Sequence, residues 1–289
     1  MKAWLVVVVA CGSAPTVVQP PKPAEGSPPE LVTTAPGATS FVVDHGDVYW
    51  LAPGSGVFEL AAGSASAQKL GDVDAKAHDL VLAKSGSASM PLYINGGSRF
   101  ARLGNPPPAE LAPEPNGKLV QNGHAAIAAM RGDDGWRVSI GERDAFQVDG
   151  DVLALAITDD EHGVVGTTTS LYRGSAATPI EGGVDALAVD GDDIFLGNTA
   201  LFEKYGNGPV DKLGPAGGRV VAMALDRDFI YWAIAAGDRD PAIYRARRAK
   251  PELELVTKVG NASQLIVDGA FLYWLDPTEG AIHRIRRQK

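Results

Sequence analysis

The stretch from Gln264 to Ile285 decides the fold. It reads Gln264-Leu265-Ile266-Val267-Asp268, a turn at Gly269, Phe271-Leu272-Tyr273-Trp274, a loop through Gly280, and then Ala281-Ile282-His283-Arg284-Ile285. Short apolar segments of this length, separated by Asp-Gly and glycine turns, are typical of antiparallel β-strands. The stretch therefore predicts three strands joined as a meander, and no segment of the chain has a convincing helical pattern.

The same pattern recurs from about residue 31 onward. Similar pairs of first and second strands are expected at 41–50, 187–196 and 223–232. A third strand with a large ring near its middle recurs seven times, around Phe58, Phe100, Trp136, Tyr172, Phe202, Tyr244 and His283. Successive rings are 42, 36, 36, 30, 42 and 39 residues apart. A period of about 38 residues predicts repeated units that bury their apolar faces on one another, with each ring directed at the adjacent unit.

A fourth, outer strand is expected after the ring-bearing strand, as at 67–70 and 252–256. Four antiparallel strands repeated at about 40 residues predict an all-β fold, a β-propeller of four-stranded blades. We expect seven blades within residues 31–289, with six as the alternative because residues 118–175 match the pattern weakly. The last repeat has no fourth strand of its own, so Glu30–Thr34 is expected to supply it and to close the ring.

Three segments begin with a Tyr-Trp pair at the second strand. They are Tyr49-Trp50-Leu51-Ala52, Tyr231-Trp232-Ala233-Ile234 and Tyr273-Trp274-Leu275-Asp276. They resemble the Tyr-Trp-Thr-Asp repeats of the propellers in low-density-lipoprotein-receptor-like proteins and their bacterial relatives. The resemblance covers most of residues 38–289 and implies the same propeller fold, although none of the three segments contains the Thr-Asp pair.

The first thirty residues have a different composition. Met1-Lys2 and the apolar run 3–10 form a secretory pattern, and eight apolar residues are too few to span a bilayer. Val8-Val9-Ala10-Cys11 resembles the lipobox of bacterial lipoproteins, which implies cleavage before Cys11, acylation of its thiol and, with Gly12 following, an outer-membrane address. An ordinary signal peptide is the alternative, and it also exports the protein. Residues 12–30 contain six prolines and predict a disordered tether.

Charge and cysteine content limit the partners. The formal net charge is −9 and the pI is about 5.0, which argues against nucleic acid or an anionic membrane surface as a partner. Cys11 is the single cysteine, so disulfides and thiol chemistry are not expected in the mature chain. We expect a monomer that binds an envelope protein or a small ligand and that meets the membrane through its lipid anchor alone.

Carboxylates gather at one predicted face of the ring, where the loops between second and third strands and the connections between blades lie. The candidate ligand-binding residues are Asp72, Asp74, Asp133, Asp149, Asp151, Asp238 and Asp276, with Asp134, Asp240 and Glu279 beside them. Converging carboxylates suit calcium or a cationic ligand. The alternative is that these aspartates stabilise their own turns, and no segment has the Asp-x-Asp-x-Asp-Gly spacing of a calcium loop. We therefore expect no cofactor, with calcium as the alternative.

Histidines give no clear site. His45, His124 and His162 are expected in turns between first and second strands, too far apart to share a metal. His78 and Asp79 are adjacent in a strand and are expected to point to opposite faces, which is a poor arrangement for acid–base catalysis. No nucleophile elbow, phosphate loop, dinucleotide fingerprint or His-Glu-x-x-His motif occurs in the mature chain.

A basic stripe lies near the C-terminus. It consists of Arg245, Arg247, Arg248, Arg284, Arg286, Arg287 and Lys289. It suits an anionic partner, or alternatively guards the edges of outer strands. We expect a binding or scaffolding module. A propeller-type hydrolase or lactonase with a carboxylate-lined metal site remains the alternative, and ligand sensing through an exposed ring such as Trp136 is a third possibility.

Overall fold

The computed structural model describes residues 28–85, 88–95, 99–102, 118–121, 126–140, 143–158, 162–206, 208–237, 240–248 and 250–288. Within these ranges the chain forms 27 strands and no helix. No helix long and apolar enough to cross a membrane is therefore found in the part of the chain that the structure describes. The all-β class expected from the sequence is confirmed.

The described strands form seven antiparallel sheets, six of four strands and one of three. In chain order the first four sheets contain β2 (Ser40–Asp44), β3 (Asp47–Ala52), β4 (Gly56–Leu60) and β5 (Gln68–Gly71); β6 (His78–Ser85), β7 (Ala88–Asn95) and β8 (Arg99–Arg102); β9 (Lys118–Gln121), β10 (Ala126–Gly132), β11 (Gly135–Ile140) and β12 (Arg143–Val148); and β13 (Val152–Ile157), β14 (Gly163–Thr167), β15 (Ser170–Arg173) and β16 (Ala176–Pro179).

The last three sheets contain β17 (Ala186–Asp190), β18 (Asp193–Gly197), β19 (Ala200–Tyr205) and β20 (Val210–Pro215); β21 (Val220–Leu225), β22 (Phe229–Ile234), β23 (Ala242–Arg247) and β24 (Lys250–Lys258); and β25 (Gln264–Asp268), β26 (Phe271–Asp276), β27 (Ala281–Arg286) and β1 (Glu30–Thr34). We number the sheets from first to seventh in this order.

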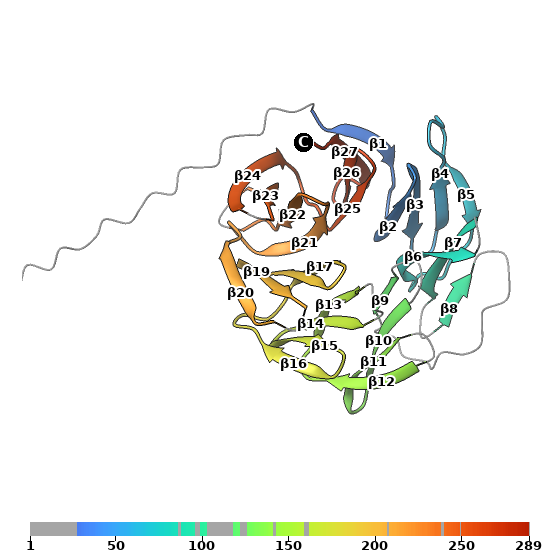
Figure 1. Cartoon of the computed structure of the whole chain (residues 1–289). Helices are drawn as coiled ribbons and strands as arrows, with labels where there is room; N and C mark the ends of the chain where they lie inside the picture. Colours follow the sequence, from blue (N-terminus) through green and yellow to red (C-terminus); the bar gives the residue numbers. More distant parts are fainter. Residues whose placement is uncertain are drawn as a thin grey trace, which may run out of the picture.

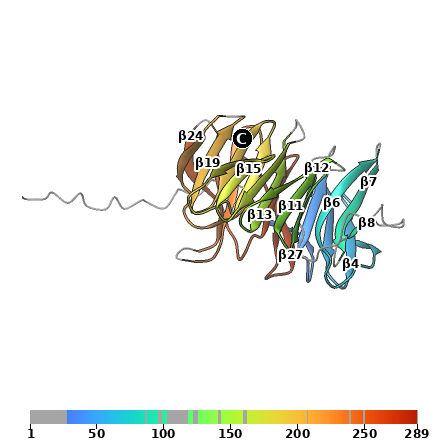
Figure 2. The same ribbon diagram turned by 90° about the horizontal axis from the view of Figure 1, so that it is seen from below.

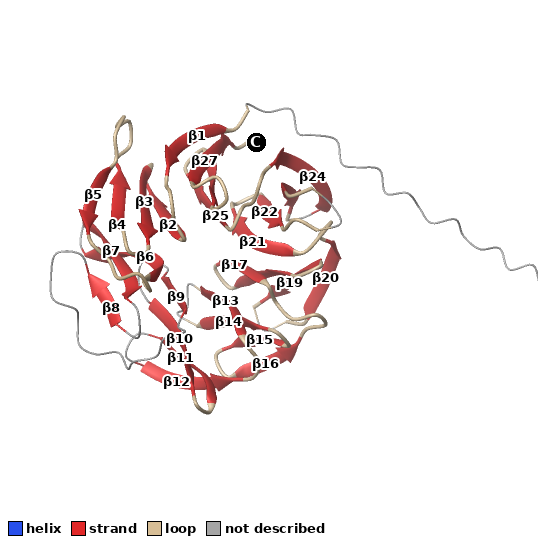
Figure 3. Ribbon diagram, turned by 180° about the vertical axis from the view of Figure 1, so that it is seen from behind, coloured by secondary structure: helices blue, strands red, loops and turns tan. Residues whose placement is uncertain are grey.

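The sheets are arranged around a common axis, with the first strand of each sheet nearest the centre (Figure 1). Each of these inner strands contacts the next, from β2 through β6, β9, β13, β17, β21 and β25, and β25 contacts β2. Viewed from the side, the strands extend from one face of the ring to the other (Figure 2). The view from behind shows the same ring of strands joined by loops (Figure 3).

The seventh sheet is made from both ends of the described chain. β1 pairs antiparallel with β27, and the register joins Glu30 to Arg284 and Thr34 to Ala281, with a bulge between Leu31 and Thr33. Arg284 Nε also donates to the Glu30 carboxylate at 3.0 Å. Glu30, the last residue of the predicted tether, belongs to this strand.

Apolar clusters fill the spaces between consecutive sheets. Trp232 and Tyr244 of the sixth sheet pack in one cluster with Phe195 and Leu201 of the fifth. The two rings of the sixth sheet also stack on each other across β22 and β23, with centroids 6.0 Å apart. In the sixth sheet, Tyr244 of the third strand therefore extends a layer of rings that faces the fifth sheet, in agreement with the prediction that this ring is directed at an adjacent unit. Burial of each large ring stabilises the fold by several kcal/mol, about 25 cal/mol per Å² of apolar area.

Ion pairs and hydrogen bonds join the aspartates at the ends of first strands to the following sheet. Arg248 Nη1 donates to Asp190 at 2.6 Å, and Arg287 Nη1 donates to Asp226 in the same way one sheet later. Asp268 accepts the backbone N–H of Gly46 at 2.8 Å, which joins the seventh sheet to the first. We call the face of the ring where these turns lie the first-turn face.

Candidate functional site

A cavity of about 160 Å³ opens between the sixth and seventh sheets. We call it the arginine cleft. The residues that line it are Pro28, Pro29, Tyr231, Arg245, Val256, Thr257, Leu272, Ile285, Arg286, Arg287 and Gln288. Three are arginines, none is an aspartate or glutamate, and the two prolines belong to the segment that leads into β1. The cleft lies beside the first-turn face, where Asp226 and Gly269 contact Arg287.

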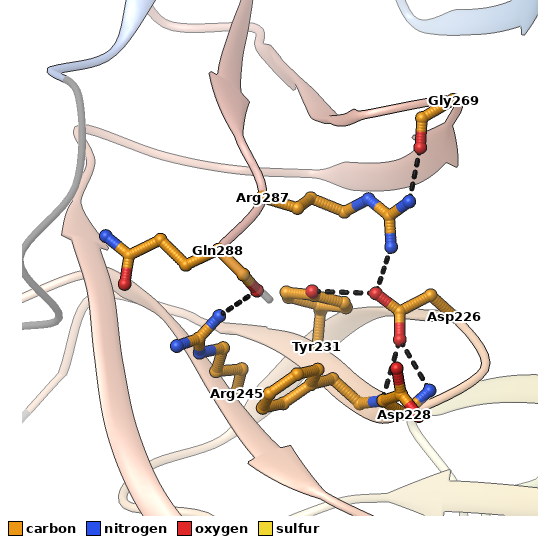
Figure 4. A network of polar contacts seen from close by, with 8 residues as sticks. Asp226, Asp228, Tyr231, Arg245, Gly269, Arg287 and Gln288 are labelled. Carbon is orange, nitrogen blue, oxygen red and sulfur yellow. Dashed lines mark hydrogen bonds and ion pairs between the residues drawn. The ribbon is translucent and has the colours of Figure 1, made fainter.

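Arg287 is held from both sides of the cleft (Figure 4). Its guanidinium donates to the Asp226 carboxylate of the sixth sheet and to the backbone carbonyl of Gly269 in the seventh. The Tyr231 hydroxyl donates to the same carboxylate at 2.9 Å. Burial and the hydrogen bond to Asp226 raise the pKa of Tyr231 to about 12, so the phenol stays neutral at physiological pH.

Asp226 is fixed in its ionised form. Burial by itself would raise its pKa, but the backbone N–H groups of Asp228 and Phe229, the Tyr231 hydroxyl and the Arg287 guanidinium together outweigh burial and lower the pKa below its usual value. The two backbone donors lie 2.8 and 2.7 Å from Oδ1. The turn between β21 and β22 therefore provides an anion at neutral pH that orients Arg287.

Arg245 lines the cleft from β23 of the sixth sheet. Its Nε donates to Glu254 at 2.8 Å, its Nη1 donates to the carbonyl of Gln288 at 2.9 Å, and its guanidinium carbon lies 4.4 Å from the ring centroid of Phe229. Arg247, on the same strand, lies 4.8 Å from that centroid. These contacts hold the planar guanidinium of Arg245 in one position, and the Glu254 carboxylate compensates its charge.

Arg286 is the cation of the cleft without a carboxylate partner. It is solvent-exposed, lies 6.0 Å from the ring centroid of Phe271 and forms no ion pair among the described residues. The Nε of Arg287 also has no hydrogen-bond partner within the described part of the chain, but it is buried. The exposed guanidinium of Arg286 therefore makes the cleft chemically suited to an anionic acceptor.

The basic stripe is thus not an edge feature. β23 and β27 are the third strands of their sheets, and β24 and β1 cover their outer sides. The expectation that these arginines guard strand edges is wrong for Arg245, Arg247, Arg284 and Arg286, because each stacks on a phenylalanine at the start of the neighbouring second strand. Lys289 lies outside the described residues.

The predicted acidic candidates in the connection between the first and second sheets act locally. Asp72 is exposed and pairs with Lys69 at 2.5 Å. Asp74 accepts the backbone N–H of Lys76 at 2.8 Å, and its carbonyl accepts those of Gly54 and Ala77. This is the turn-stabilising behaviour that was the alternative to ligand binding.

Two candidates near the third and fourth sheets lie close to aromatic and basic groups. The Asp151 carboxylate accepts the indole N–H of Trp136 at 3.4 Å and pairs with Arg131 at 3.2 Å. The backbone N–H of Asp149 donates to the Tyr172 hydroxyl at 2.9 Å. Trp136 is 7% exposed, so its ring belongs to the apolar layer between these sheets.

Two further candidates, Asp133 and Asp276, lie at turns between second and third strands. Asp133 is an exposed residue of the β10–β11 turn. Asp276 is 1% exposed, and its carboxylate accepts the backbone N–H groups of Asn261, Thr278 and Glu279 at 2.8, 2.9 and 3.1 Å. Asp238 lies outside the described residues. Among the residues that are described, no group of three or more His, Cys, Asp or Glu side chains is placed to hold a metal ion.

The histidine expectations have mixed outcomes. His45 lies in the β2–β3 turn and contacts Asp44 at 2.8 Å. The expectation that His78 and Asp79 point apart is wrong, because His78 Nδ1 lies 3.3 Å from the Asp79 carboxylate. Asp79 has a φ of 50° and the register shifts between His78 and Leu80, so this bulge breaks the alternation of side chains. His124 is outside the described ranges.

Sequence reasoning missed Asp226, Tyr231 and the two prolines of the cleft. The sequence did contain a signal for Asp226, which the prediction did not use. Asp44, Asp190 and Asp268 occupy the same position at the ends of other first strands. The pairing of Asp226 with an arginine 61 residues away had no local signal.

The chain matches no protein-family model, and no curated protein matches it. Solved structures do match. They include a chain of a mitotic checkpoint complex (TM-score 0.65, 14% identity, covering 100% of this chain and 99% of that chain), the WD40 β-propeller domain of Doa1 (0.65, 12%, 91% and 97%) and YCF48 bound to D1 peptide (0.61, 12%, 93% and 98%). At these identities the likeness shows the fold alone, which is that of a β-propeller.

Proposed function

We propose that this chain is an exported binding module, a closed seven-bladed propeller that recognises an anionic segment of a protein partner at the arginine cleft. Seven sheets and the contact between β25 and β2 support the blade number and the closure. The pattern at Cys11 supports lipid anchoring in the cell envelope, with residues 12–27 as the tether.

The observation that carries the proposal is the charge of the cleft. Three arginines line a cavity in a chain whose formal net charge is −9. Asp226 compensates Arg287 and Glu254 compensates Arg245, which leaves the charge of Arg286 without a carboxylate among the described residues. Arginine is suited to recognition of carboxylates because its planar donors can form two parallel hydrogen bonds.

The solved neighbours agree with binding of a protein segment without establishing it for this chain. YCF48 was solved bound to D1 peptide, and another neighbour belongs to a mitotic checkpoint complex. These partners are known for the neighbouring structures and not for this chain. A fold can host many functions, so the proposal depends on the cleft and not on the likeness.

The proposal is tested with a fluorescein-labelled peptide, Gly-Asp-Leu-Asp-Leu, and the matched peptide in which Asn replaces both Asp residues and an amide replaces the C-terminal carboxylate. We expect the acidic peptide to bind about 10-fold more tightly, with Arg286→Gln removing most of the difference. Arg284→Gln is the matched control, because Arg284 lies on the same strand and stacks on the same Phe271 ring but does not line the cleft. Equal binding of both peptides would overturn the proposal.

The anchor is tested separately by cell fractionation. Cys11→Ser is expected to move the protein from the membrane fraction to the soluble envelope fraction, because it removes the thiol that acylation requires. Unchanged membrane association of the variant would overturn the lipid-anchor proposal and would leave the cleft unaffected.

A further inference from the structure

We infer that the arginine cleft receives the C-terminal residue of its partner, with the terminal carboxylate at the arginines and an apolar side chain in the cavity. The inference rests on the proposed function and specifies the ligand of the same site. It follows from the size and the mixed lining of the cleft and from the exposed guanidinium of Arg286, which has no carboxylate partner among the described residues.

The size limits the occupant to one residue. The cavity holds about 160 Å³, close to the roughly 150 Å³ of an apolar cavity that accommodates one benzene molecule. A helix or a strand does not fit into that volume, whereas one leucine-sized side chain does. The cleft therefore accepts the end of a chain or one protruding side chain.

The lining separates into an apolar part and a cationic part. Leu272 and Ile285 are buried, and Val256 is half-buried, on the sides provided by β26, β27 and β24. The arginines lie at the end of β27 and on β23. An occupant that satisfies both parts carries an apolar side chain and a carboxylate a few ångströms apart. In a peptide, the C-terminal residue has both groups on one carbon, whereas an internal Asp or Glu has a carboxylate and no apolar group.

One cation of the cleft is free for an occupant. Arg245 and Arg287 already have carboxylate partners, whereas the exposed Arg286 has none among the described residues. The two oxygens of one terminal carboxylate match the parallel donors of the Arg286 guanidinium.

Pro28 and Pro29 disfavour the other common mode of peptide binding, in which the peptide adds a strand to a sheet. Pro28 and Pro29 have no backbone N–H, so a peptide cannot pair with this segment as an added strand. β1, which follows them, is already paired with β27. End-on insertion therefore fits the cleft better than strand addition along its rim.

The test uses the full chain carrying Cys11→Ser and three fluorescein-labelled probes. The first is Gly-Ser-Gly-Ser-Gly-Leu with a free carboxylate, the second is its C-terminal amide, and the third is the amide Gly-Leu-Asp-Gly-Ser-Gly, which has an internal carboxylate. We expect the free acid to bind at least about 10-fold more tightly than either amide. Replacing its terminal Leu by Ser is expected to weaken binding about 5-fold, as loss of an apolar side chain from a pocket does.

The three probes distinguish failure of this inference from failure of the proposed function. If the internal-carboxylate probe binds as tightly as the free acid and both depend on Arg286, the proposed function stands and this inference is overturned. If no probe binds, both are overturned. N-acetyl-leucine that competes as well as the free-acid peptide would overturn recognition of a peptide and would indicate a small carboxylate. A thermal melt of Arg286→Gln and Arg284→Gln confirms that each variant is folded.

Discussion

Two carboxylates of this protein, the partly buried Asp226 and the buried Glu203, have pKa shifts in opposite directions. Burial would raise the pKa of Asp226, but four donors from its own turn, from Tyr231 and from Arg287 lower it. Burial also raises the pKa of Glu203; a hydrogen bond from Tyr205 opposes the increase but does not overcome it, and Oε1 of Glu203 has no partner among the described residues. The number of donors at each carboxylate decides the sign, because both are removed from water.

Asp226→Asn is expected to destabilise the fold by about 3 kcal/mol at pH 7, since it removes the anion of a largely buried ion pair. A carboxylate with a lowered folded-state pKa stabilises the fold above its unfolded-state pKa, about 3.9, and this contribution is lost as the pH falls through the folded-state value. The difference in stability between wild type and variant should therefore shrink below about pH 4. Urea unfolding at pH 7, 5 and 3 measures it.

Glu203→Gln is the matched comparison for the same measurement. The raised pKa means that the ionised form is disfavoured in the folded state, so a neutral side chain of the same shape should cost less than about 1 kcal/mol at pH 7. A loss of stability as large as that of Asp226→Asn would contradict the assignment of opposite shifts.

At the scale of elements, turns between second and third strands depend on a buried polar side chain. In the β18–β19 turn, Asn198 Nδ2 donates to the carbonyls of Glu181 and Gly183 at 3.0 and 2.7 Å, and Oδ1 accepts the N–H of Ala200. Asp276 has the corresponding role in the β26–β27 turn. Each side chain ties the turn to the loop that enters its sheet.

Asn198→Ala is expected to lower the free energy of unfolding by about 2–3 kcal/mol, because three backbone groups near a residue that is 3% exposed lose their partner. Urea unfolding with an unchanged slope measures the loss. Asn261→Ala is the matched control: Asn261 is half-buried, and its side chain makes a single, solvent-exposed contact of 3.5 Å with Thr278 Oγ1, so its loss should stay within about 0.5 kcal/mol. Similar losses for both variants would contradict the role given to Asn198.

At the scale of the whole molecule, the two ends of the described chain meet in one sheet. β1 covers the outer side of β27, and Phe41 and Trp50 of the first sheet pack in one cluster with Tyr273 and Ile282 of the seventh. The last sheet is thus completed by the earliest strand and packed against the first sheet. A propeller without this strand would present the unpaired edge of β27 to solvent.

Deletion of residues 1–34 is expected to lower the unfolding temperature by about 10 °C, because β1 and its hydrogen bonds to β27 contribute a few kcal/mol. The exposed edge should also promote self-association, which light scattering detects. Deletion of residues 1–27 is the control, since it leaves β1 in place and should leave both measurements unchanged. A fully stable monomer after the longer deletion would argue against a structural role for β1.

The strands of the repeat could be predicted from sequence because their signals are local. The expected segments at 264–268, 271–274 and 281–285 correspond to β25, β26 and β27, and the seven large rings at intervals of 30 to 42 residues lie on the third strands of the seven sheets. Alternation of apolar residues and turn residues acts over a few positions, so a single stretch reveals it.

The arginine cleft could be predicted only in part. The strand type, the repeat and the basic stripe could be predicted from the amino-acid order, since these depend on neighbours along the chain. The contact of Arg287 with Asp226, the contact of Arg245 with the carbonyl of Gln288, and the presence of Pro28 and Pro29 in the same cleft arise only in the folded protein. Their positions depend on how one sheet packs against the next, and that packing joins residues that are distant in the chain.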